Sequence, residues 1–262
     1  MATIKGYHPG EFCWTDLGTT DVAGTKKFYR GVLGLTAKDV PMDDEGHFYS
    51  LLRAKGKDVC AIYPVPPGSK QAKMRASWVP FIAVANVDRA VKKATAAGAT
   101  LGLGPFEALK AGRMAVLLDP TGAKFALWQA REHSGAKVKG VPGAVCWRDL
   151  STPDRKAAGR FYTKVFGWKL ENMDFSGNPY HLFKVGGEGF GGMWPTPLPK
   201  HPPAWFTYWL VENCPRTVAK AKRRGGKVIL GPITVPETCT FAIIRDPQGA
   251  AFGALEPLVA WG

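Results

Sequence analysis

The chain has 262 residues, of which 45% are hydrophobic and 21% are charged, and its net charge is +14. This composition is ordinary for a soluble globular protein, and the length allows two hydrophobic cores. Five cysteines are too few for a disulfide framework in a chain of this size. No apolar run approaches the roughly 20 residues that a membrane-spanning helix needs.

The N-terminal stretch MATIKGYHPGEF lacks the apolar core of a signal peptide, so we expect a cytoplasmic protein. The positive charge suggests nucleic acid as a partner, because lysine and arginine neutralise phosphates. The basic residues cluster mainly in helix-like segments, however, which favours a solvated outer face or a general attraction of anionic ligands. No RNA-reading sheet motif or zinc-finger spacing occurs, and we therefore predict no nucleic-acid partner.

An internal repeat dominates the sequence. CWTDLGTTDVAGTKKFYRGVLGL, which begins at Cys13, returns 133 residues later as CWRDLSTPDRKAAGRFYTKVFGW, and the Asp119-Pro120 pair returns after 127 residues. Two long repeats predict paired modules, whereas a solenoid needs three or more short ones. We place the first module at residues 1–133, a linker at 134–141 and the second module at 142–262.

In the first module, alternating apolar and polar residues predict a strand over 13–17, and Asp21 is placed to cap a helix over 22–32 that Gly34 ends. Apolar runs and glycine-containing turns predict the remaining elements in order: strands at 48–54, 60–65 and 78–84, a helix at 87–97, and two strands within 114–128 joined by an Asp-Pro-x-Gly turn.

The second module repeats this order. Asp154 is placed to cap a helix over 157–165, and Gly167 ends it. The matching elements follow in sequence: strands at 146–150, 180–185, 190–195 and 205–211, a helix at 215–224, and a strand pair within 241–255. Each module is therefore a βαβββ-like unit written twice, and the predicted fold class is α+β.

The helix endings FYRGVLGL and FYTKVFGW, together with the closing DPTGAKFALW and DPQGAAFGAL, carry a family resemblance. Over about 10–258 the chain resembles the vicinal-oxygen-chelate superfamily, which includes glyoxalase I, extradiol dioxygenases and bleomycin-resistance proteins. It is most similar to a tandem actinobacterial branch described as glyoxalase-like or hydroxylase-like. The resemblance implies curved mixed sheets with flanking helices around a ligand cavity. It implies no single chemistry, because this scaffold hosts isomerases, oxygenases and plain binders.

The resemblance also implies where a metal would bind. Catalytic members hold a divalent ion with a His on the first strand, a His or Gln on the central strand and a Glu on the last. Carried onto this chain, the positions fall on residues that cannot bind such an ion: Trp14, near Val79 and Ala126 in the first module, and Trp147, Phe206 and Gly253 in the second. We therefore expect no metal and no cofactor.

None of the five histidines recurs at an equivalent position in the other module: His8, His47, His133, His181 and His201. His47 and His181 lie in or next to strands that would line a cavity wall. An imidazole titrates near neutral pH, so His181 is a candidate general base, with a hydrogen-bonding or solvent-facing role as the alternative.

Asp16 and Asp149 are the other candidate catalytic residues. Each lies two positions after a Trp, and strand alternation places residues i and i+2 on one face. If the Trp side chains point into the cavity, the carboxylates do too, and burial there raises the pKa and suits proton transfer. The alternative is a structural carboxylate that accepts hydrogen bonds from a neighbouring strand or from the surroundings of Arg148.

Nine Trp and seven Tyr residues provide flat rings of the kind that planar ligands stack against. We predict a ligand-binding role for six aromatic residues: Trp14, Trp78, Trp147, Tyr180, Trp205 and Tyr208. The alternative is that such rings only fill the core, as we expect of Trp128 and Trp209.

The sequence thus favours a metal-independent small-molecule-binding protein of the glyoxalase/bleomycin-resistance type, with a planar or aromatic metabolite as its ligand. One alternative is a lyase, isomerase, cyclase or hydroxylase-like enzyme that acts on a natural-product intermediate by acid–base chemistry. Another is an interaction protein whose cavities are filled. The pairing of two modules in one chain favours a monomer, with a homodimer as the alternative.

Overall fold

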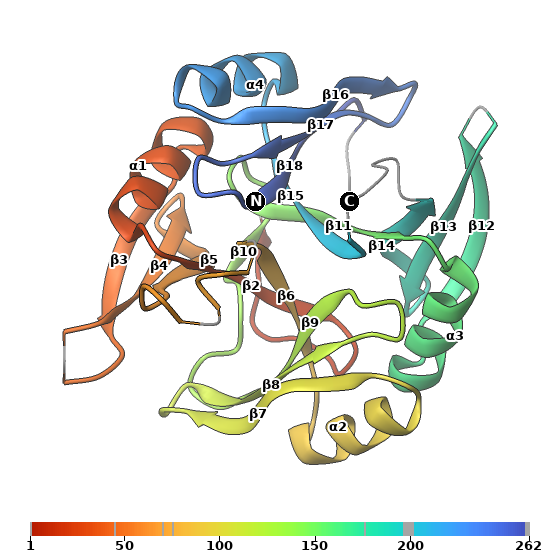
Figure 1. Ribbon diagram of the computed structural model, residues 1–262. Coiled ribbons are helices and arrows are strands. Elements are labelled where there is room, and N and C mark those ends of the chain that lie inside the picture. Colours follow the sequence, from red (N-terminus) through yellow and green to blue (C-terminus); the bar gives the residue numbers. More distant parts are fainter. Residues whose placement is uncertain are drawn as a thin grey trace.

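The computed structural model describes residues 2–44, 46–69, 71–74, 76–175, 177–195 and 202–259, and His201 lies outside them. Two mixed eight-stranded sheets, each formed by one half of the chain, make up the body of the protein (Figure 1). Over these described ranges four helices accompany them: α1 (Val22–Leu33), α2 (Val87–Ala96), α3 (Arg155–Phe166) and α4 (Cys214–Arg223).

The first sheet has the strand order β3-β4-β5-β2-β6-β9-β8-β7. Its strands in chain order are β2 (Phe12–Thr19), β3 (Thr36–Pro41), β4 (Phe48–Ala54), β5 (Lys57–Pro64), β6 (Trp78–Ala83), β7 (Thr100–Ala108), β8 (Gly112–Leu118) and β9 (Lys124–Ala130). β2 and β6 run antiparallel at the centre, with β5 parallel to β2 and β9 parallel to β6.

The second sheet has the same order, β12-β13-β14-β11-β15-β18-β17-β16. Its strands are β11 (Val145–Thr152), β12 (Lys169–Phe175), β13 (Asn178–Val185), β14 (Glu188–Pro195), β15 (Ala204–Leu210), β16 (Lys227–Val235), β17 (Cys239–Arg245) and β18 (Ala251–Pro257). Each module thus contains two βαβββ units, which confirms the predicted class and the predicted doubling.

The repeated helices begin and end as their sequences predict. The Asp21 side chain accepts a hydrogen bond from the Gly24 backbone N–H at the start of α1, and Asp154 accepts one from Ala157 at the start of α3. Gly34 and Gly167 follow the two helices in the left-handed conformation, with φ of 72° and 74°.

The segment between the sheets is not free of structure. Within residues 134–141, β10 (Val138–Lys139) pairs antiparallel with β1 (Ala2–Thr3). Both sheets nevertheless begin and end outside this segment, since their strands lie within 12–130 and 145–257.

The helix-covered faces of the sheets pack against one another across the two modules. One hydrophobic core joins the α1 unit to the α4 unit, and a second joins the α2 unit to the α3 unit. In Figure 1, α1 and α4 accordingly lie together at the upper left, and α2 and α3 at the lower right. The opposite, helix-free face of each sheet is left to a separate cluster of side chains.

Two reciprocal hydrogen-bonded chains cross between the modules. The Trp78 indole donates to the Tyr29 hydroxyl at 2.8 Å, and Tyr29 donates at 3.0 Å to Asp246 of the other module. The second chain repeats these contacts in the opposite direction, from Trp205 through Tyr162 to Asp119, at 2.8 and 3.0 Å.

These chains correct one expectation about the ligand site. Trp78 and Trp205 lie on the helix-covered faces, opposite Leu17 and Leu150 of the neighbouring strands, and not on the faces that carry Asp16 and Asp149. Because they are 2% and 4% exposed and hydrogen-bonded within the core, they hold the two modules together.

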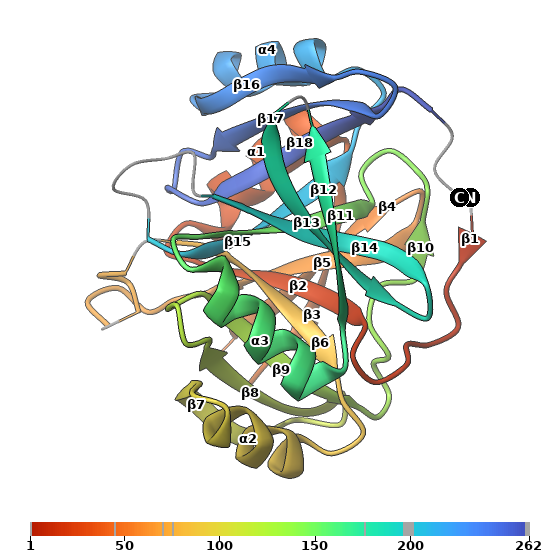
Figure 2. The same cartoon turned by 90° about the vertical axis from the view of Figure 1, so that its right-hand side faces the viewer.

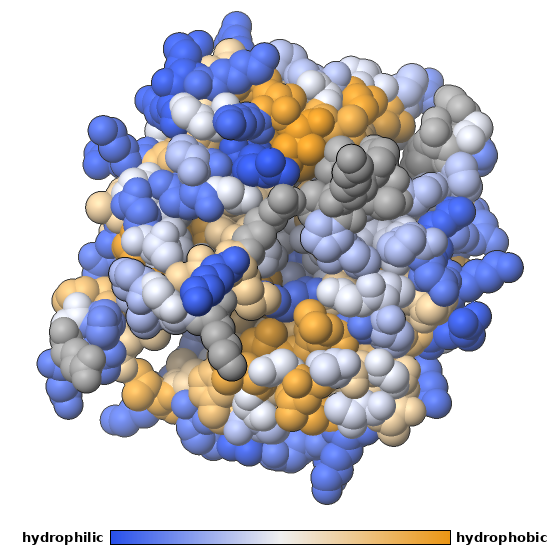
Figure 3. All heavy atoms as spheres, in the orientation of Figure 1, coloured by the Kyte–Doolittle hydropathy of each residue, from blue (hydrophilic) through white to orange (hydrophobic). Residues whose placement is uncertain are grey.

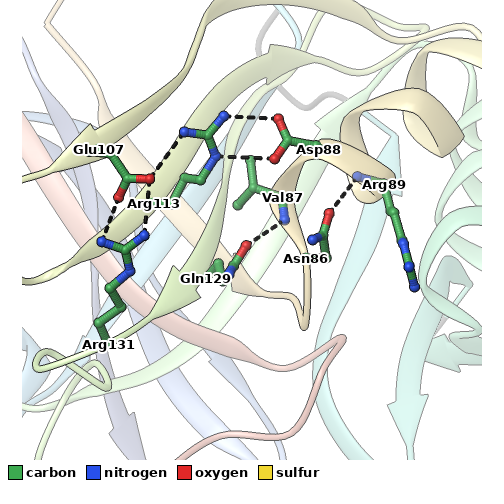
Figure 4. A network of polar contacts seen from close by, with 8 residues as sticks. All are labelled: Asn86, Val87, Asp88, Arg89, Glu107, Arg113, Gln129 and Arg131. Atoms are coloured by element: carbon green, nitrogen blue, oxygen red, sulfur yellow. Dashed lines mark hydrogen bonds and ion pairs between the residues drawn. The ribbon is translucent and has the colours of Figure 1, made fainter.

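A polar network fixes the outer end of the α2 unit (Figure 4). Arg113 on β8 bridges Asp88 on α2 and Glu107 on β7, and Arg131 contacts the same glutamate. The Gln129 side-chain oxygen accepts from the Val87 backbone N–H. Since the charged members are largely exposed, we expect the network to orient α2 more than to stabilise the fold.

The surface carries both charged and apolar areas. Figure 3 shows hydrophobic residues gathered over β16–β17 at the top of that view and over β7–β8 at the bottom. Exposed apolar side chains in these strands include Leu103 and Ile233, which are 58% and 39% exposed. Within the described part of the chain, no helix is long and apolar enough to cross a membrane.

Candidate functional site

The helix-free face of each module holds the carboxylates that the sequence singled out. In the first module Trp14 lies opposite Phe81, and Phe81 opposite Ala126, so the three form one row across the strands. In the second module the equivalent row is Trp147, Tyr208 and Gly253.

The alignment of these rows corrects the second of the three inferred metal-ligand positions in each module. Val79 and Phe206 were expected near the second ligand position, but they lie opposite Asp16 and Asp149, one row away. Phe81 and Tyr208 occupy the expected row instead. The predicted position is displaced by two residues along the strand in each module. The displaced and the actual residue point to the same face, because side chains alternate along a strand.

The residues of these rows do not fit the divalent ion that catalytic relatives hold. They offer no imidazole and no carboxylate, which are the usual ligands for such an ion. Among the described residues, no three His, Cys, Asp or Glu side chains gather into a possible metal site.

A Trp–Tyr–Asp triad occupies the helix-free face of the first module. The Trp14 indole donates to the Tyr49 hydroxyl at 2.8 Å, and Tyr49 donates to Asp16 at 3.1 Å. Trp14 is 3% exposed and Asp16 is 7% exposed. Tyr49 is not among the residues predicted to bind a ligand, although it stands 131 residues before Tyr180, and that spacing is the available signal.

The second module repeats the triad with tighter contacts. The Trp147 indole donates to Tyr180 at 2.9 Å and to Asp149 at 3.0 Å, while Tyr180 donates to Asp149 at 2.6 Å. Tyr208 adjoins the same carboxylate. The structure therefore brings Trp147, Asp149, Tyr180 and Tyr208 together, as it does Trp14, Asp16 and Tyr49.

Burial governs the ionisation of both carboxyl groups. Loss of solvent raises the pKa of Asp16 to about 7, against the lowering effects of the Tyr49 hydrogen bond and the Lys124 charge. Burial also raises the pKa of Asp149 to about 6, where hydrogen bonds from Tyr180 and Trp147 oppose it. Both groups can therefore accept or release a proton near neutral pH.

The two faces differ in what surrounds the triad. Lys124 lies on the face of the first module, two residues before Ala126, and burial lowers its pKa while the charge of Asp16 opposes that shift. Ala251 stands at the equivalent place in the second module. There, Tyr208 takes the place of Phe81, and it fits because Gly253 beside it has no Cβ.

Each helix-free face also contains buried polar atoms without a partner among the described residues. In the first module this is Nε2 of His133, whose ring lies 4.5 Å from that of Trp14, and burial lowers its pKa to about 4. In the second module the Trp194 indole nitrogen is in this condition. Since buried polar groups are normally hydrogen-bonded, these atoms mark places where a ligand can supply the partner.

The structure does not place His181 with these groups. Its neighbours across the sheet are Asn172 and Met193, and Met193 belongs to the helix-covered core, so His181 points to the face opposite Tyr180. His47 is likewise remote from the triads, on an exposed turn beside Asp43. His47 does precede β4 and His181 does lie on β13, as predicted, but neither side chain joins a triad.

The remaining predicted core aromatics lie on different faces. Trp209 is fully buried in the helix-covered core, as expected. Trp128 lies on the helix-free face, where its indole donates to the His133 carbonyl at 2.9 Å.

Comparison with known proteins identifies the family. The model of the Glyoxalase/Bleomycin resistance protein/Dioxygenase superfamily matches residues 12–127 and 140–253, and the chain belongs to that superfamily. The structure is similar to the Mn(II)-bound glyoxalase from Novosphingobium aromaticivorans, with a TM-score of 0.65 and 19% identity over 96% of this chain and 83% of that one. It is also similar to the 2,3-dioxygenase LapB from Pseudomonas sp. KL28, with a TM-score of 0.61, 17% identity and coverage of 97% and 93%.

Two relatives are similar over nearly their whole length. "Putative glyoxylase CFP32" of Mycobacterium tuberculosis is 38% identical over 258 residues, which are 98% of each chain. "Anthracycline biosynthesis protein DauV" of Streptomyces sp. strain C5 is 34% identical over 263 residues, covering 95% of this chain and 94% of that protein.

Proposed function

We propose that the chain is a metal-independent small-molecule-binding protein that holds a planar or aromatic metabolite against the helix-free faces of its sheets. The observation that carries this proposal is an unpartnered buried polar atom beside the Trp–Tyr–Asp triad of each module, His133 Nε2 in the first and the Trp194 indole nitrogen in the second. Flat indole and phenol rings offer area for stacking, and the unpartnered atoms offer hydrogen bonds that fix orientation.

The relatives support the chemical class of the ligand. One of them is named for the biosynthesis of anthracyclines, which are planar polycyclic aromatic compounds. A ligand of that kind matches the aromatic lining of the second module, where Trp147, Trp194 and Tyr208 lie on one face.

A thermal-shift screen against polycyclic quinones tests this proposal. Ligands of the right class raise the melting temperature, and the stabilisation grows with the logarithm of the ligand concentration divided by Kd. Trp147→Phe keeps a ring but removes the N–H, and we expect it to weaken binding about tenfold, or roughly 1.4 kcal/mol. Trp209→Phe, on the helix-covered face, is the matched control and should bind normally. Failure of every compound to raise the melting temperature would favour an interaction protein with filled interiors.

Metal independence has its own test. Protein purified without chelators should contain far less than one equivalent of zinc, iron, nickel or manganese, and its ligand binding should survive EDTA. A tightly held equivalent whose removal abolishes binding would overturn this part of the proposal.

A lyase, isomerase, cyclase or hydroxylase-like enzyme is the second candidate, and the raised pKa values of Asp16 and Asp149 favour it. For a compound that the protein converts, Asp16→Asn or Asp149→Asn should lower kcat by about 10²–10⁴ while the fold persists. Unchanged turnover in both variants would remove the carboxylates from the mechanism. His181 remains a proposed general base only for chemistry on the opposite face of the sheet.

We further propose that the protein acts in the cytoplasm. We also propose that it is a monomer, because its modules already cover each other's helix faces. Sedimentation of a dimer at micromolar concentration would contradict the monomer.

A further inference from the structure

A hollow of about 590 Å³ lies on the outside of the second module, between α3 and the strands β12 and β13. Figure 2 shows α3 at the front of the molecule beside these strands. Polar side chains from three elements line the hollow: Arg155, Lys156, Arg160, Lys164, Asn172 and His181.

The hollow is strongly cationic. Four of its lining side chains are basic, and none is a carboxylate. Two acidic residues next to its elements are engaged in other contacts, since Asp154 caps α3 and Glu171 is paired with Lys184. The positive charges are therefore not compensated within the hollow.

The floor of the hollow is apolar. It is formed by Gly159 and Leu170, and Leu170 is 39% exposed. The absence of a side chain at Gly159 keeps the floor low, because a Cβ there would come within 2.7 Å of the Leu170 side chain. A site with an apolar floor and a cationic rim suits a ligand that combines an apolar body with an anionic group.

The His181 ring is held at the edge of this hollow. Nδ1 lies 2.6 Å from the Asn172 side-chain oxygen, which can only accept, so Nδ1 carries the proton. Nε2 therefore accepts from the Arg155 guanidinium at 3.2 Å. Burial and the Arg155 charge both lower the pKa of His181, which keeps the ring neutral at neutral pH.

The first module shows the same place in a filled and neutralised form. Its counterparts of Gly159, Asn172 and His181 are Lys26, Asp39 and Ser50. Lys26 pairs with Asp39 at 2.5 Å, and the Ser50 hydroxyl donates to the same carboxylate at 2.7 Å. The second module has neither the lysine that fills this place nor the carboxylate that neutralises it.

We propose that this hollow is a second binding site, which takes a soluble phosphate ester with an apolar or planar body. A phosphate monoester carries nearly two charges and three acceptor oxygens, which match the guanidinium groups of Arg155 and Arg160. The apolar body lies over Gly159 and Leu170. The site is independent of the triads on the opposite face of the sheet.

Calorimetric titration with 1-naphthyl phosphate tests the proposal, with inorganic phosphate and 1-naphthol as the partial ligands. We expect naphthyl phosphate to bind at least tenfold more tightly than either partial ligand. Arg160→Ala should weaken binding at least tenfold. Lys27→Ala removes one positive charge from the equivalent place on α1 and should change the affinity less than twofold.

A graft of the first module's residues gives the decisive variant. Gly159→Lys, Leu170→Ala and Asn172→Asp together restore the lysine–aspartate pair and should abolish naphthyl phosphate binding. If the graft does not fold, Arg155→Ala with Arg160→Ala replaces it. Trp147→Phe should have no effect, which separates this site from the helix-free face.

Several outcomes would overturn the proposal. Equal weakening by Lys27→Ala and Arg160→Ala would show a general attraction by the net charge. Equal affinity for naphthol would place the ligand in an apolar site elsewhere. Sedimentation with anionic lipid vesicles that depends on Arg160, without binding of naphthyl phosphate, would assign the hollow to a membrane surface.

Discussion

The helix-free faces of the two modules have the same triad in different surroundings. Trp, Tyr and Asp meet in both, but the first module adds Lys124 and Phe81, whereas the second adds Tyr208 and has Ala251 in place of the lysine. A feature kept in both copies is one that the shared fold tolerates or needs. We therefore expect the residues that differ between the copies to determine which ligand each face binds or which reaction it supports.

The largest expected effect comes from filling the space beside Tyr208, which distinguishes the helix-free face of the second module from that of the first. Gly253→Ala places a Cβ about 2.0 Å from the Tyr208 ring, close to its root, so the ring has to move. We expect a loss of about 3 kcal/mol in the free energy of unfolding, at the upper end of the usual cost of overpacking, measured by urea denaturation. The matched variant in the first module, Ala126→Gly, should cost no more than about 1 kcal/mol. Equal losses would show that Tyr208 does not depend on the glycine.

The two hydrogen-bonded chains of side chains that join the modules should lose equal stability when their tyrosines are substituted, because the repeat relates them. Tyr29→Phe leaves Asp246 and the Trp78 indole each without one buried hydrogen bond, and Tyr162→Phe does the same to Asp119 and Trp205. Each substitution should cost about 1–3 kcal/mol in denaturation experiments. A large difference between the two would break the symmetry that the structure shows.

The two buried carboxyl groups, Asp16 and Asp149, should make stability depend on pH differently in the two modules. A raised pKa means that the folded state binds more protons than the unfolded state, so stability falls as pH rises from about 4 toward the folded-state pKa. Asp16→Asn removes that penalty. Above pH 7 we expect it to be more stable than the parent protein, by on the order of 1–3 kcal/mol.

Asp149→Asn is the matched measurement in the second module. Its gain should be complete by about pH 6, because that is where the Asp149 pKa lies, whereas the gain of Asp16→Asn continues to about pH 7. Thermal unfolding between pH 4 and 8 follows both curves. A gain that is independent of pH would contradict burial as the cause.

The smallest effect concerns Lys124. Replacement by Met removes a positive charge that lowers the Asp16 pKa, so that pKa should rise further, by a fraction of a unit. Carbonyl-carbon NMR titration reports it directly. The Asp149 pKa serves as the internal control and should stay unchanged, since Ala251 stands where the lysine would be.

The sequence by itself determined the doubled architecture. Both helix starts at Asp21 and Asp154, both ends at Gly34 and Gly167, and the strand pairs around the Asp-Pro turns are local features that residue type and spacing specify. It also placed Asp16 and Trp14 on one face, because strand alternation is fixed by backbone geometry.

Edge strands were less accessible from sequence. All six residues of β3 are exposed, so no alternation of apolar and polar residues marks that strand, and its partner β4 defines it through backbone hydrogen bonds. The same difficulty applies to β7, whose residues are mostly exposed.

Only the tertiary structure decided which aromatic rings face a ligand. Trp78 and Trp14 lie on neighbouring strands, and their sequences give no sign that one faces the helices and the other the helix-free side. Pairing register makes that choice, since a shift of one residue moves a side chain to the other face. Register also brings Tyr49 next to Asp16 and places His181 on the face opposite Asp149. Neither outcome could be predicted from local sequence, because both depend on pairing between residues far apart in the chain.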